Sequence, residues 1–466
     1  MNFVELRFLA FFAIVFGVHW ALRWNTARKV FLLACSYVFY GAWDWRFLGL
    51  ILVSTALDYC AGLGIQGARS PRGRRGWLLV SLIGNLGILG FFKYYNFFIA
   101  SAAGLLASLG LETSDHTLEI VLPVGISFYT FQTLSYSLDV FSGRLEARKS
   151  VLDLALFVAF FPQLVAGPIV RAVQFLPQLD DRRRFADVDV RAALSVFLVG
   201  FVKKAVVSDN LAAVVDPVFA DPGAYGTGSV WLGMFLFHVQ VYCDFSGYSD
   251  MAIGSAGLLG YRLPVNFDFP YLTTNMTTFW RRWHITLGSW LTDYVYIPLG
   301  GNRRGTRRTH VNILILFTLC GLWHGASWNY VLWGFLNGLV LAVERAGLKD
   351  WVERRPDAFK RAYVLVIWFI TLAFFRTTGI GDALQYLGSM FLPFAAGGSG
   401  SEVVPPVWWI GVGVFMVLHY VAKNQLVGPR LARLPDWAFS FGFGLAVALV
   451  LPWVATDTTP FIYFQF

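Results

Sequence analysis

Residues 311–325 read Val-Asn-Ile-Leu-Ile-Leu-Phe-Thr-Leu-Cys-Gly-Leu-Trp-His-Gly, a nearly continuous apolar run that ends in a histidine between glycines. A helix of this composition belongs in a membrane, where a buried polar group without a partner is energetically costly. A second histidine, His284, ends the stretch Phe279-Trp280-Arg281-Arg282-Trp283-His284. An imidazole kept in such surroundings needs a physical reason, so both histidines are candidates for chemistry.

The composition of the whole chain extends this interpretation. Of its 466 residues, 57% are hydrophobic and 14% are charged, and the mean hydropathy is +0.58. Soluble domains carry about 25% charged residues. We predict an all-α polytopic membrane protein with about 11–12 transmembrane helices. The candidate spans are residues 6–22, 29–43, 46–64, 77–99, 119–141, 190–207, 229–260, 312–323, 329–343, 362–378, 405–422 and 436–454.

No hydrophilic linker divides the chain, so we predict one membrane domain over residues 1–454, followed by an extracytoplasmic tail at residues 455–466. Loops rich in Arg and Lys remain cytoplasmic, and the alternation of basic with acidic or neutral loops sets the orientation. The net charge of +9 is then mainly a topology signal. The alternative is that the basic loops bind an anionic cytosolic substrate.

Two apolar segments are interrupted. Residues 151–170 contain Pro162 and Ala166-Gly167-Pro168, and residues 271–300 end in Ile297-Pro298-Leu299-Gly300. Irregular backbone at membrane depth is tolerated where it lines a cavity. We therefore predict re-entrant or interfacial helices that form the walls of a cavity.

Glycines on both sides of His324 allow a ligand or another backbone to approach closely. A neutral imidazole there can act as a general base. The alternative is a structural histidine bonded to a carbonyl group. For His284, the alternative is an incidental residue of an interfacial aromatic belt, because Trp283, Leu287 and Trp290 follow a helical spacing.

Other motifs are few. Asp244 and Asp250 lie in an otherwise apolar segment, where we expect them to hold neighbouring helices together. The four cysteines form no CxxC pair, and no dense cluster of metal ligands is present, so we predict no metal site. Beyond the net charge, nothing supports nucleic-acid binding.

Four stretches together resemble the membrane-bound O-acyltransferase family, in its bacterial branch that acts in alginate O-acetylation and teichoic-acid D-alanylation. They are residues 36–44, 244–250, 279–290 with 296–301, and 321–328. The resemblance implies helices around a central funnel, a location in the bacterial cytoplasmic (inner) membrane among its lipids, and a cytosolic thioester donor. For acetylating members this donor is acetyl-CoA, with no permanently bound cofactor.

The resemblance also assigns roles to residues. His324 matches the family's invariant histidine, and His284 matches its second conserved position. This implies that His324 is the general base and that His284 assists it. Candidate substrate-binding residues are Trp280, Arg281, Arg282, Trp283, Trp323, Asp244, Arg303 and Arg304. The arginines are suited to the coenzyme's phosphates, with topology as the competing explanation.

The last six residues of the sequence are Phe-Ile-Tyr-Phe-Gln-Phe, which resemble an F-x-Y-F-x-F motif of bacterial export-acylation systems. By this resemblance, Tyr463 carries the acyl group as an ester and passes it to a periplasmic SGNH-type O-acetyltransferase. Alternatively, the motif is only an aromatic anchor, and the enzyme acylates a lipid or glycan itself or transfers D-alanine. A different alternative is a transporter or channel for an acylated carrier.

Overall fold

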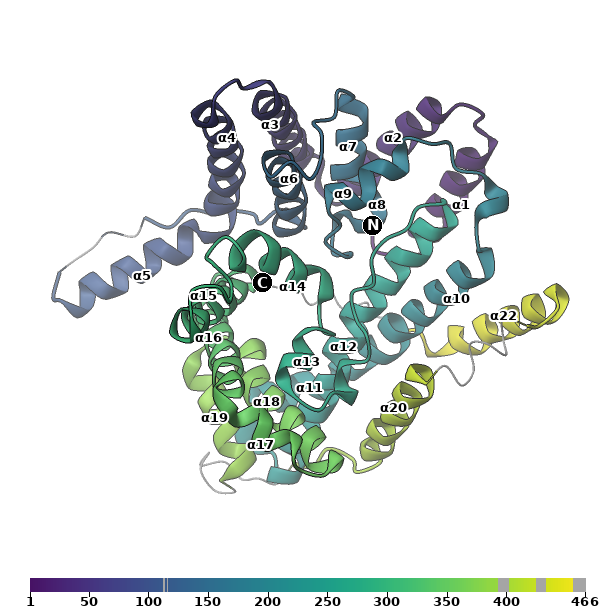
Figure 1. Cartoon of the computed structure of the whole chain (residues 1–466). Helices are drawn as coiled ribbons and strands as arrows, with labels where there is room; N and C mark the ends of the chain where they lie inside the picture. Colours follow the sequence, from purple (N-terminus) through teal and green to yellow (C-terminus); the bar gives the residue numbers. More distant parts are fainter. Residues whose placement is uncertain (112–113, 115, 393–401, 425–432, 456–466) are drawn as a thin grey trace. The chain divides into compact units, whose positions relative to one another are not determined.

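The computed structural model describes residues 1–111, 114, 116–392, 402–424 and 433–455 (Figure 1). These residues form helices joined by short turns, and no strand is present among them. Five of their apolar helical segments are long enough to cross a membrane: Asn25–Gly67, Pro71–Ser108, Trp328–Glu353, Asp357–Arg376 and Asp436–Trp453. The predicted class, an all-α polytopic membrane protein, is confirmed.

The described chain divides into two compact units, residues 1–193 with 252–264, and residues 194–251 with 265–466. The helices of the first unit are α1 (Leu6–Ala21), α2 (Asn25–Asp44), α3 (Leu48–Gly67), α4 (Pro71–Leu89), α5 (Tyr95–Ser108), α6 (Ile126–Phe141), α7 (Val151–Ala159), α8 (Phe161–Leu164) and α9 (Ala172–Phe175). Helices α10 (Val190–Phe201) and α12 (Thr227–Leu258) have residues in both units.

Helices α3, α4 and α6 lie side by side in the first unit (Figure 1). A fully buried carboxylate joins them: Asp58 on α3 accepts hydrogen bonds from Ser81 and Asn85 on α4 and from Ser137 on α6. The Ser137 Oγ and Asn85 Nδ2 donors lie 2.6 and 2.8 Å from the carboxylate. Side-chain hydrogen bonds of this kind link helices whose exposed faces are apolar.

The interruption predicted within residues 151–170 is present. Helix α7 ends at Ala159, and the four-residue helix α8 follows with Pro162 in its first turn. Pro162 cannot donate a backbone hydrogen bond, so α7 cannot continue through it. Residues 153–170 are all buried.

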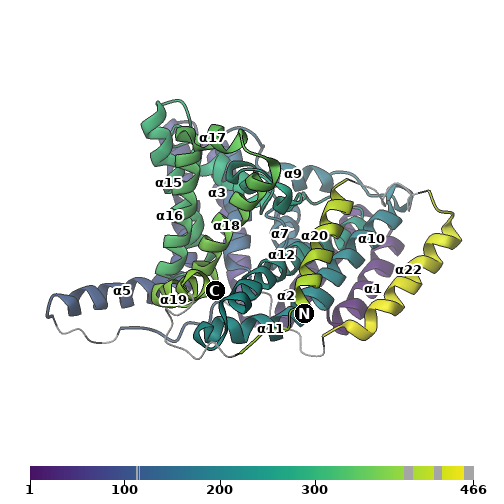
Figure 2. The ribbon, with the colours of Figure 1, turned by 90° about the horizontal axis from the view of Figure 1, so that it is seen from below.

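The second unit contains α11 (Asp209–Ala220), α13 (Met276–Trp280), α14 (Ile285–Leu291), α15 (Thr306–His324), α16 (Trp328–Val343), α17 (Lys349–Glu353), α18 (Asp357–Arg376), α19 (Ile380–Phe391), α20 (Trp408–Lys423) and α22 (Asp436–Val450). Helices α15 and α16 run alongside each other (Figure 2). They touch backbone to backbone: a Cβ added at Gly334 would lie 2.1 Å from the carbonyl oxygen of Phe317. Small residues permit such close packing of membrane helices.

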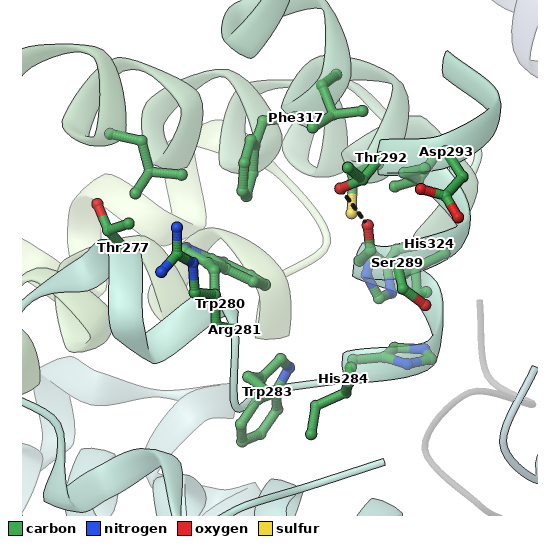
Figure 3. A pocket seen from close by; sticks show the side chains of 17 residues that line it. Thr277, Trp280, Arg281, Trp283, His284, Ser289, Thr292, Asp293, Phe317 and His324 are labelled. Atoms are coloured by element: carbon green, nitrogen blue, oxygen red, sulfur yellow. Dashed lines mark hydrogen bonds between the residues drawn. The ribbon is translucent and has the colours of Figure 1, made fainter. Parts of the chain in front are cut away.

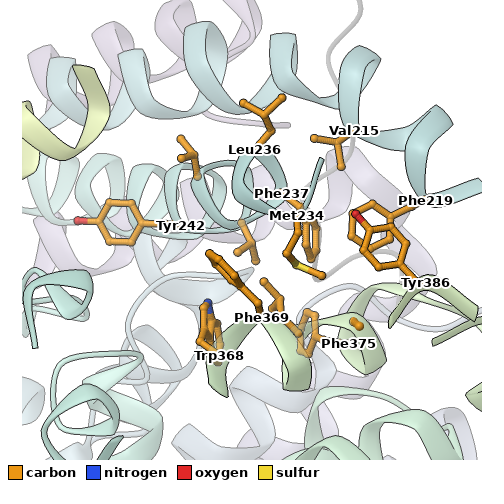
Figure 4. Packing of buried hydrophobic residues seen from close by; sticks show 14 of the residues in the cluster. Val215, Phe219, Met234, Leu236, Phe237, Tyr242, Trp368, Phe369, Phe375 and Tyr386 are labelled. Carbon is orange, nitrogen blue, oxygen red and sulfur yellow. The ribbon is translucent and has the colours of Figure 1, made fainter. Parts of the chain in front are cut away.

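Aromatic side chains dominate the core of the second unit (Figure 4). Phe219 on α11 stacks on Tyr386 on α19, with ring centroids 4.1 Å apart. Phe369 on α18 and Phe237 on α12 are buried in the same cluster. Large rings fill the spaces between these helices and fix their positions.

Two boundary predictions were wrong. The span predicted to begin at residue 119 begins at Ile126, because Gly125, in the left-handed conformation, lies so close to α8 that a Cβ would be 2.8 Å from a backbone oxygen. Residues Asp209–Ala220 and Ile380–Phe391 lie between the predicted spans, yet they form the helices α11 and α19. Their charged residues suggested loops, but the buried positions follow a helical period, as with Leu211, Val215 and Val218.

The close contact between α15 and α16 leads to a prediction. The substitution Gly334→Ala forces a methyl group onto the Phe317 carbonyl and is expected to lower the free energy of unfolding by about 1–3 kcal/mol. Gly413→Ala on α20, where a Cβ meets nothing within 4 Å, is the control and is expected to be neutral or mildly stabilising. Unfolding in detergent, followed by circular dichroism, measures both. Equal stability of the two variants would contradict the packing described.

Candidate active site

Helix α13 is positioned by a buried carboxylate. Glu344, which follows the end of α16, accepts hydrogen bonds from the backbone nitrogens of Met276 and Thr277 at 2.7 and 2.9 Å and from the Thr277 hydroxyl at 2.7 Å. Asn275 caps the same end through the nitrogen of Thr278. A negative charge at the start of a helix satisfies otherwise unbonded N–H groups and the helix dipole. These hydrogen bonds fix the position of α13, and with it the position of Trp280, the last residue of this helix.

The helical conformation is interrupted between α13 and α14, and His284 is the residue just before α14. Its backbone adopts φ 46° and ψ 52°, the left-handed region that non-glycine residues rarely enter. The structure therefore differs from the sequence interpretation, in which Trp283, Leu287 and Trp290 share one helical face. All three side chains are buried, but Trp283 precedes the break. Such strain costs about 1–3 kcal/mol and persists only where the surroundings enforce it.

Asn266 supplies that enforcement. Its backbone carbonyl accepts from the nitrogen of Ile285 at 2.9 Å, and its side-chain oxygen lies 3.1 Å from His284 Nδ1. The same oxygen accepts from the backbone nitrogen and the hydroxyl of Thr286, at 3.3 and 2.9 Å. Burial lowers the pKa of His284 to about 3, so its imidazole is neutral at physiological pH.

His324 is the last residue of α15, one residue beyond the span predicted over residues 312–323. Its ring lies among Trp323, Trp333 and Phe375, with centroid distances of 4.9, 5.0 and 5.4 Å. Gly325 follows it, and any Cβ there would strike the ring of Tyr330 at 2.2 Å. Any larger residue at this position would have to displace the Tyr330 ring, which a glycine avoids.

The two histidines line one cavity of about 400 Å³, with ring centroids 6.3 Å apart (Figure 3). This volume lies within the range of small-molecule sites. The α13–α14 segment provides one wall and α15 provides another. The lining residues are Thr277, Trp280, Arg281, Trp283, His284, Ile285, Leu287, Gly288, Ser289, Leu291, Thr292, Asp293, Leu316, Phe317, Cys320, His324 and Leu341.

Of the predicted site residues, the cavity brings together His284, His324, Trp280, Arg281 and Trp283. Others lie elsewhere. The ring of Trp323 packs against both histidines without lining the cavity. Arg282 lies 3.6 Å from Asp268, and Arg303 and Arg304 are exposed in the turn before α15. Tyr463 lies outside the described residues.

Asp244 does not line the cavity either. It forms an ion pair at 2.6 Å with Lys204, which also pairs with Asp209 at 2.7 Å, and all three side chains are buried. Lys204 lies in a π-helical turn, Val202–Ser208, next to a close approach of Gly200 to Gly247 on α12. The expectation that this aspartate holds helices together agrees with these contacts.

The sequence interpretation missed several residues of the site. Asn266 lies in an aperiodic stretch, and no local pattern indicates its contact with His284. Glu344 directly follows the span predicted over residues 329–343, and a carboxylate at the end of an apolar helix could have indicated a buried cap. Ser289, Thr292 and Asp293 line the cavity because of the break at His284.

The fold and this cavity define a polytopic membrane enzyme with a pair of buried histidines. The profile of MBOAT, the membrane-bound O-acyltransferase family, matches residues 144–379. The probable alginate O-acetylase AlgI of Pseudomonas putida is 41% identical over the full length of both chains. The chain therefore belongs to the membrane-bound O-acyltransferase family, and it is an O-acyltransferase.

Two other relatives show how far the similarity extends. A peptidoglycan O-acetyltransferase of Helicobacter pylori is 35% identical over 78% of this chain and 73% of its own. A teichoic acid D-alanyltransferase of Streptococcus thermophilus is 26% identical over 51% of this chain and 60% of its own. The chain is thus more similar to the relatives from Pseudomonas putida and Helicobacter pylori, whose names indicate O-acetylation, than to the D-alanyltransferase from Streptococcus thermophilus.

The buried ion triad leads to a second prediction. Lys204→Met leaves two buried carboxylates without their cation and is expected to lower the free energy of unfolding by about 3–5 kcal/mol. Adding Asp209→Asn and Asp244→Asn removes the uncompensated charge and should restore most of that stability. Lys203→Met, which breaks a partly exposed pair with Asp250, is the milder control. A Lys204→Met variant as stable as the wild type would disprove the structural role.

Proposed function

We propose that the protein moves an acetyl group from cytosolic acetyl-CoA to the phenol of Tyr463, from which a periplasmic SGNH-type transferase passes it to an alginate-like polysaccharide. The observation that carries this proposal is the pair of buried histidines on one cavity of a membrane O-acyltransferase. On this proposal, the protein works in the bacterial cytoplasmic membrane.

His324 is the general base. Its position at the carbonyl end of α15 favours the positive charge that an imidazole acquires when it takes a proton. The surrounding aromatic rings exclude water, which strengthens electrostatic interactions in the site. His284 lines the same cavity in a neutral form and assists at the thioester.

The chemistry is acyl transfer from sulfur to oxygen. His324 takes the phenolic proton as the Tyr463 oxygen attacks the thioester carbonyl carbon. A C–O ester bond forms, the C–S bond breaks, and coenzyme A leaves as a thiolate that takes up a proton. A phenol, with a pKa of about 10, yields a more reactive ester than an alcohol does, which suits an intermediate that must be transferred again.

Donor binding is assigned to the cavity and its rim. Arg281 is exposed and lines the cavity, so its guanidinium is suited to a phosphate of the coenzyme. The indole rings of Trp280 and Trp283 form apolar walls for the pantetheine arm. Arg303 and Arg304, exposed before α15, are further candidates for the phosphates.

The acceptor is proposed from the relatives. The full-length match to the alginate O-acetylase of Pseudomonas putida favours O-acetylation of an exopolysaccharide of that type. The shorter match to the Streptococcus thermophilus teichoic acid D-alanyltransferase makes D-alanine the less favoured cargo.

The test incubates the purified full-length protein with acetyl-CoA and measures both released coenzyme A and acetyl groups on the protein. Wild type is expected to release coenzyme A and to gain one acetyl mass by intact-mass analysis. His324→Ala should slow both processes by roughly 100-fold or more, the contribution of a general base. Tyr463→Phe should not gain the acetyl mass.

Matched controls are available within the chain. His419→Phe replaces a buried histidine that does not line the cavity, and Tyr420→Phe replaces an exposed tyrosine on α20. Both are expected to behave like wild type. Unchanged coenzyme A release in His324→Ala would refute the catalytic assignment, and equal labelling of wild type and Tyr463→Phe would refute the tyrosine intermediate.

A further inference from the structure

The bonds around Asn266 determine how His284 carries its proton. The backbone nitrogen of Thr286 is an obligate donor and faces Asn266 Oδ1, while Asn266 Nδ2 donates to the hydroxyl of Ser249 at 3.1 Å. The amide orientation is therefore fixed, because a flipped amide would place two donors against each other. The Asn266 side chain is fully buried.

With the amide oxygen facing it, His284 Nδ1 must be the donor. A neutral imidazole carries one proton, so the lone pair then lies on Nε2. We infer that Asn266 is a positioning residue that holds His284 as the Nδ1–H tautomer and so makes Nε2 a hydrogen-bond acceptor in the cavity. This inference rests on the proposed function for its catalytic consequence, but not for the tautomer itself.

The other groups near His284 do not favour the Nε2–H tautomer or a protonated ring. The ring of Phe245 on α12 meets it edge to face at 4.6 Å. The other titratable groups that line the same cavity are His324, 6.3 Å away between ring centroids, Cys320 and Asp293, while Arg281 is its charged cation. Burial dominates the lowered pKa of His284, which keeps the ring neutral.

The prediction has a spectroscopic arm that does not depend on substrate. In protein labelled with ¹⁵N-histidine, with His284 assigned through His284→Gln, the ring shifts should show the Nδ1–H tautomer. Asn266→Leu should shift the ring toward the Nε2–H form. Asn337→Leu, at another fully buried asparagine, should leave the shifts unchanged. An Nε2–H tautomer in wild type would overturn the inference.

The kinetic arm uses Asn266→Asp. A carboxylate beside Nδ1–H raises the pKa of His284, so the neutral imidazole is lost as the pH falls through the raised value. The rate of acetyl-CoA cleavage should therefore gain an acid limb, displaced by at least about one pH unit from the wild-type profile. A merely structural asparagine predicts a loss of rate with no change in the profile. If acetyl-CoA is not cleaved but the tautomer is as stated, the proposed function fails and this inference stands.

An independent observation lies in the first unit, where arginines surround a hollow of about 620 Å³. Arg182, Arg183, Arg184 and Arg262 line it, together with the acidic Asp181 and Asp187. Arg184 is paired with Asp187, and Arg183 donates to the carbonyl oxygen of Gln178. Within the part of the chain that the structure describes, no hydrogen bond or ion pair occupies the guanidinium groups of Arg182 and Arg262.

The wall of this hollow touches the end of an apolar helix. A Cβ at Gly260 would lie 3.3 Å from the ring of Trp20 in the last turn of α1 and 3.1 Å from Arg183 Cβ. The next apolar segment begins at Asn25, and the Arg28 guanidinium lies 4.9 Å from the same Trp20 ring. Tryptophans are enriched at membrane surfaces, and Trp20 at the end of one apolar helix and close to the start of the next supports a position of this hollow near the surface.

We propose that this hollow binds the phosphate of an anionic phospholipid headgroup. Two uncommitted guanidinium groups can form charge-assisted hydrogen bonds with it, and the buried Arg28, which donates to the Arg183 carbonyl oxygen, adds positive potential behind them. The location at the end of α1 places the acyl chains beside apolar helices.

The test measures thermal stability of the detergent-solubilised full chain with added lipid. Phosphatidylglycerol should raise the melting temperature of wild type more than phosphatidylcholine with the same chains. The variant Arg182→Gln/Arg262→Gln should need roughly tenfold more phosphatidylglycerol for the same shift. The variant Arg69→Gln/Arg72→Gln loses equal charge from two exposed residues, one between α3 and α4 and one in the first turn of α4, and should respond like wild type.

Each remaining outcome would overturn the proposal. If Arg182→Gln/Arg262→Gln responds like wild type, the hollow is not the site. If inorganic phosphate alone reproduces the shift, the site takes a soluble phosphate and not a lipid.

Discussion

The contact of α15 with α16 through their glycines determines where the catalytic candidate lies. At Gly321 and Gly334 the two backbones approach so closely that no side chain fits between them. The close pairing holds the end of α15, and Gly325 lets the chain turn away at the ring of Tyr330. His324 therefore sits at a fixed helix end among aromatic rings, where water is scarce and the helix dipole is felt.

Buried polar groups impose a second constraint on the structure. Each of them must find a hydrogen-bond or ionic partner inside an apolar protein. Glu344 meets the first N–H groups of α13, Lys204 meets two aspartates, and Asp58 meets hydroxyl and amide donors. Asn266 does this for His284, whose strained backbone and ring it bonds at once. Glu344 and Asn266 in this way hold the short helix α13 and the start of α14, which helix propensity alone would not keep in place.

The sequence predicted the class of fold, because apolar runs are a local signal. It also indicated His284, His324, Trp280 and Arg281, and these four residues line one cavity, while their roles stay predictions. The sequence could not indicate Asn266, because its contact with His284 joins residues 18 positions apart and no periodic pattern relates the two. For Asp244 the sequence left two interpretations, a substrate-binding residue and a residue that holds helices together. Its buried ion pair with Lys204, which is distant in the sequence, favours the second.

The two histidines differ in what holds them. His324 stands at the carbonyl end of a helix, which favours the protonated state that follows proton abstraction. His284 lies at the start of α14, is neutral, and bonds a neutral amide through Nδ1. An amide orients the ring without stabilising its cation, whereas a carboxylate would do both. The environment thus suits one histidine to gain a proton during the reaction and the other to accept a hydrogen bond while remaining neutral, and this difference separates their roles on the shared cavity.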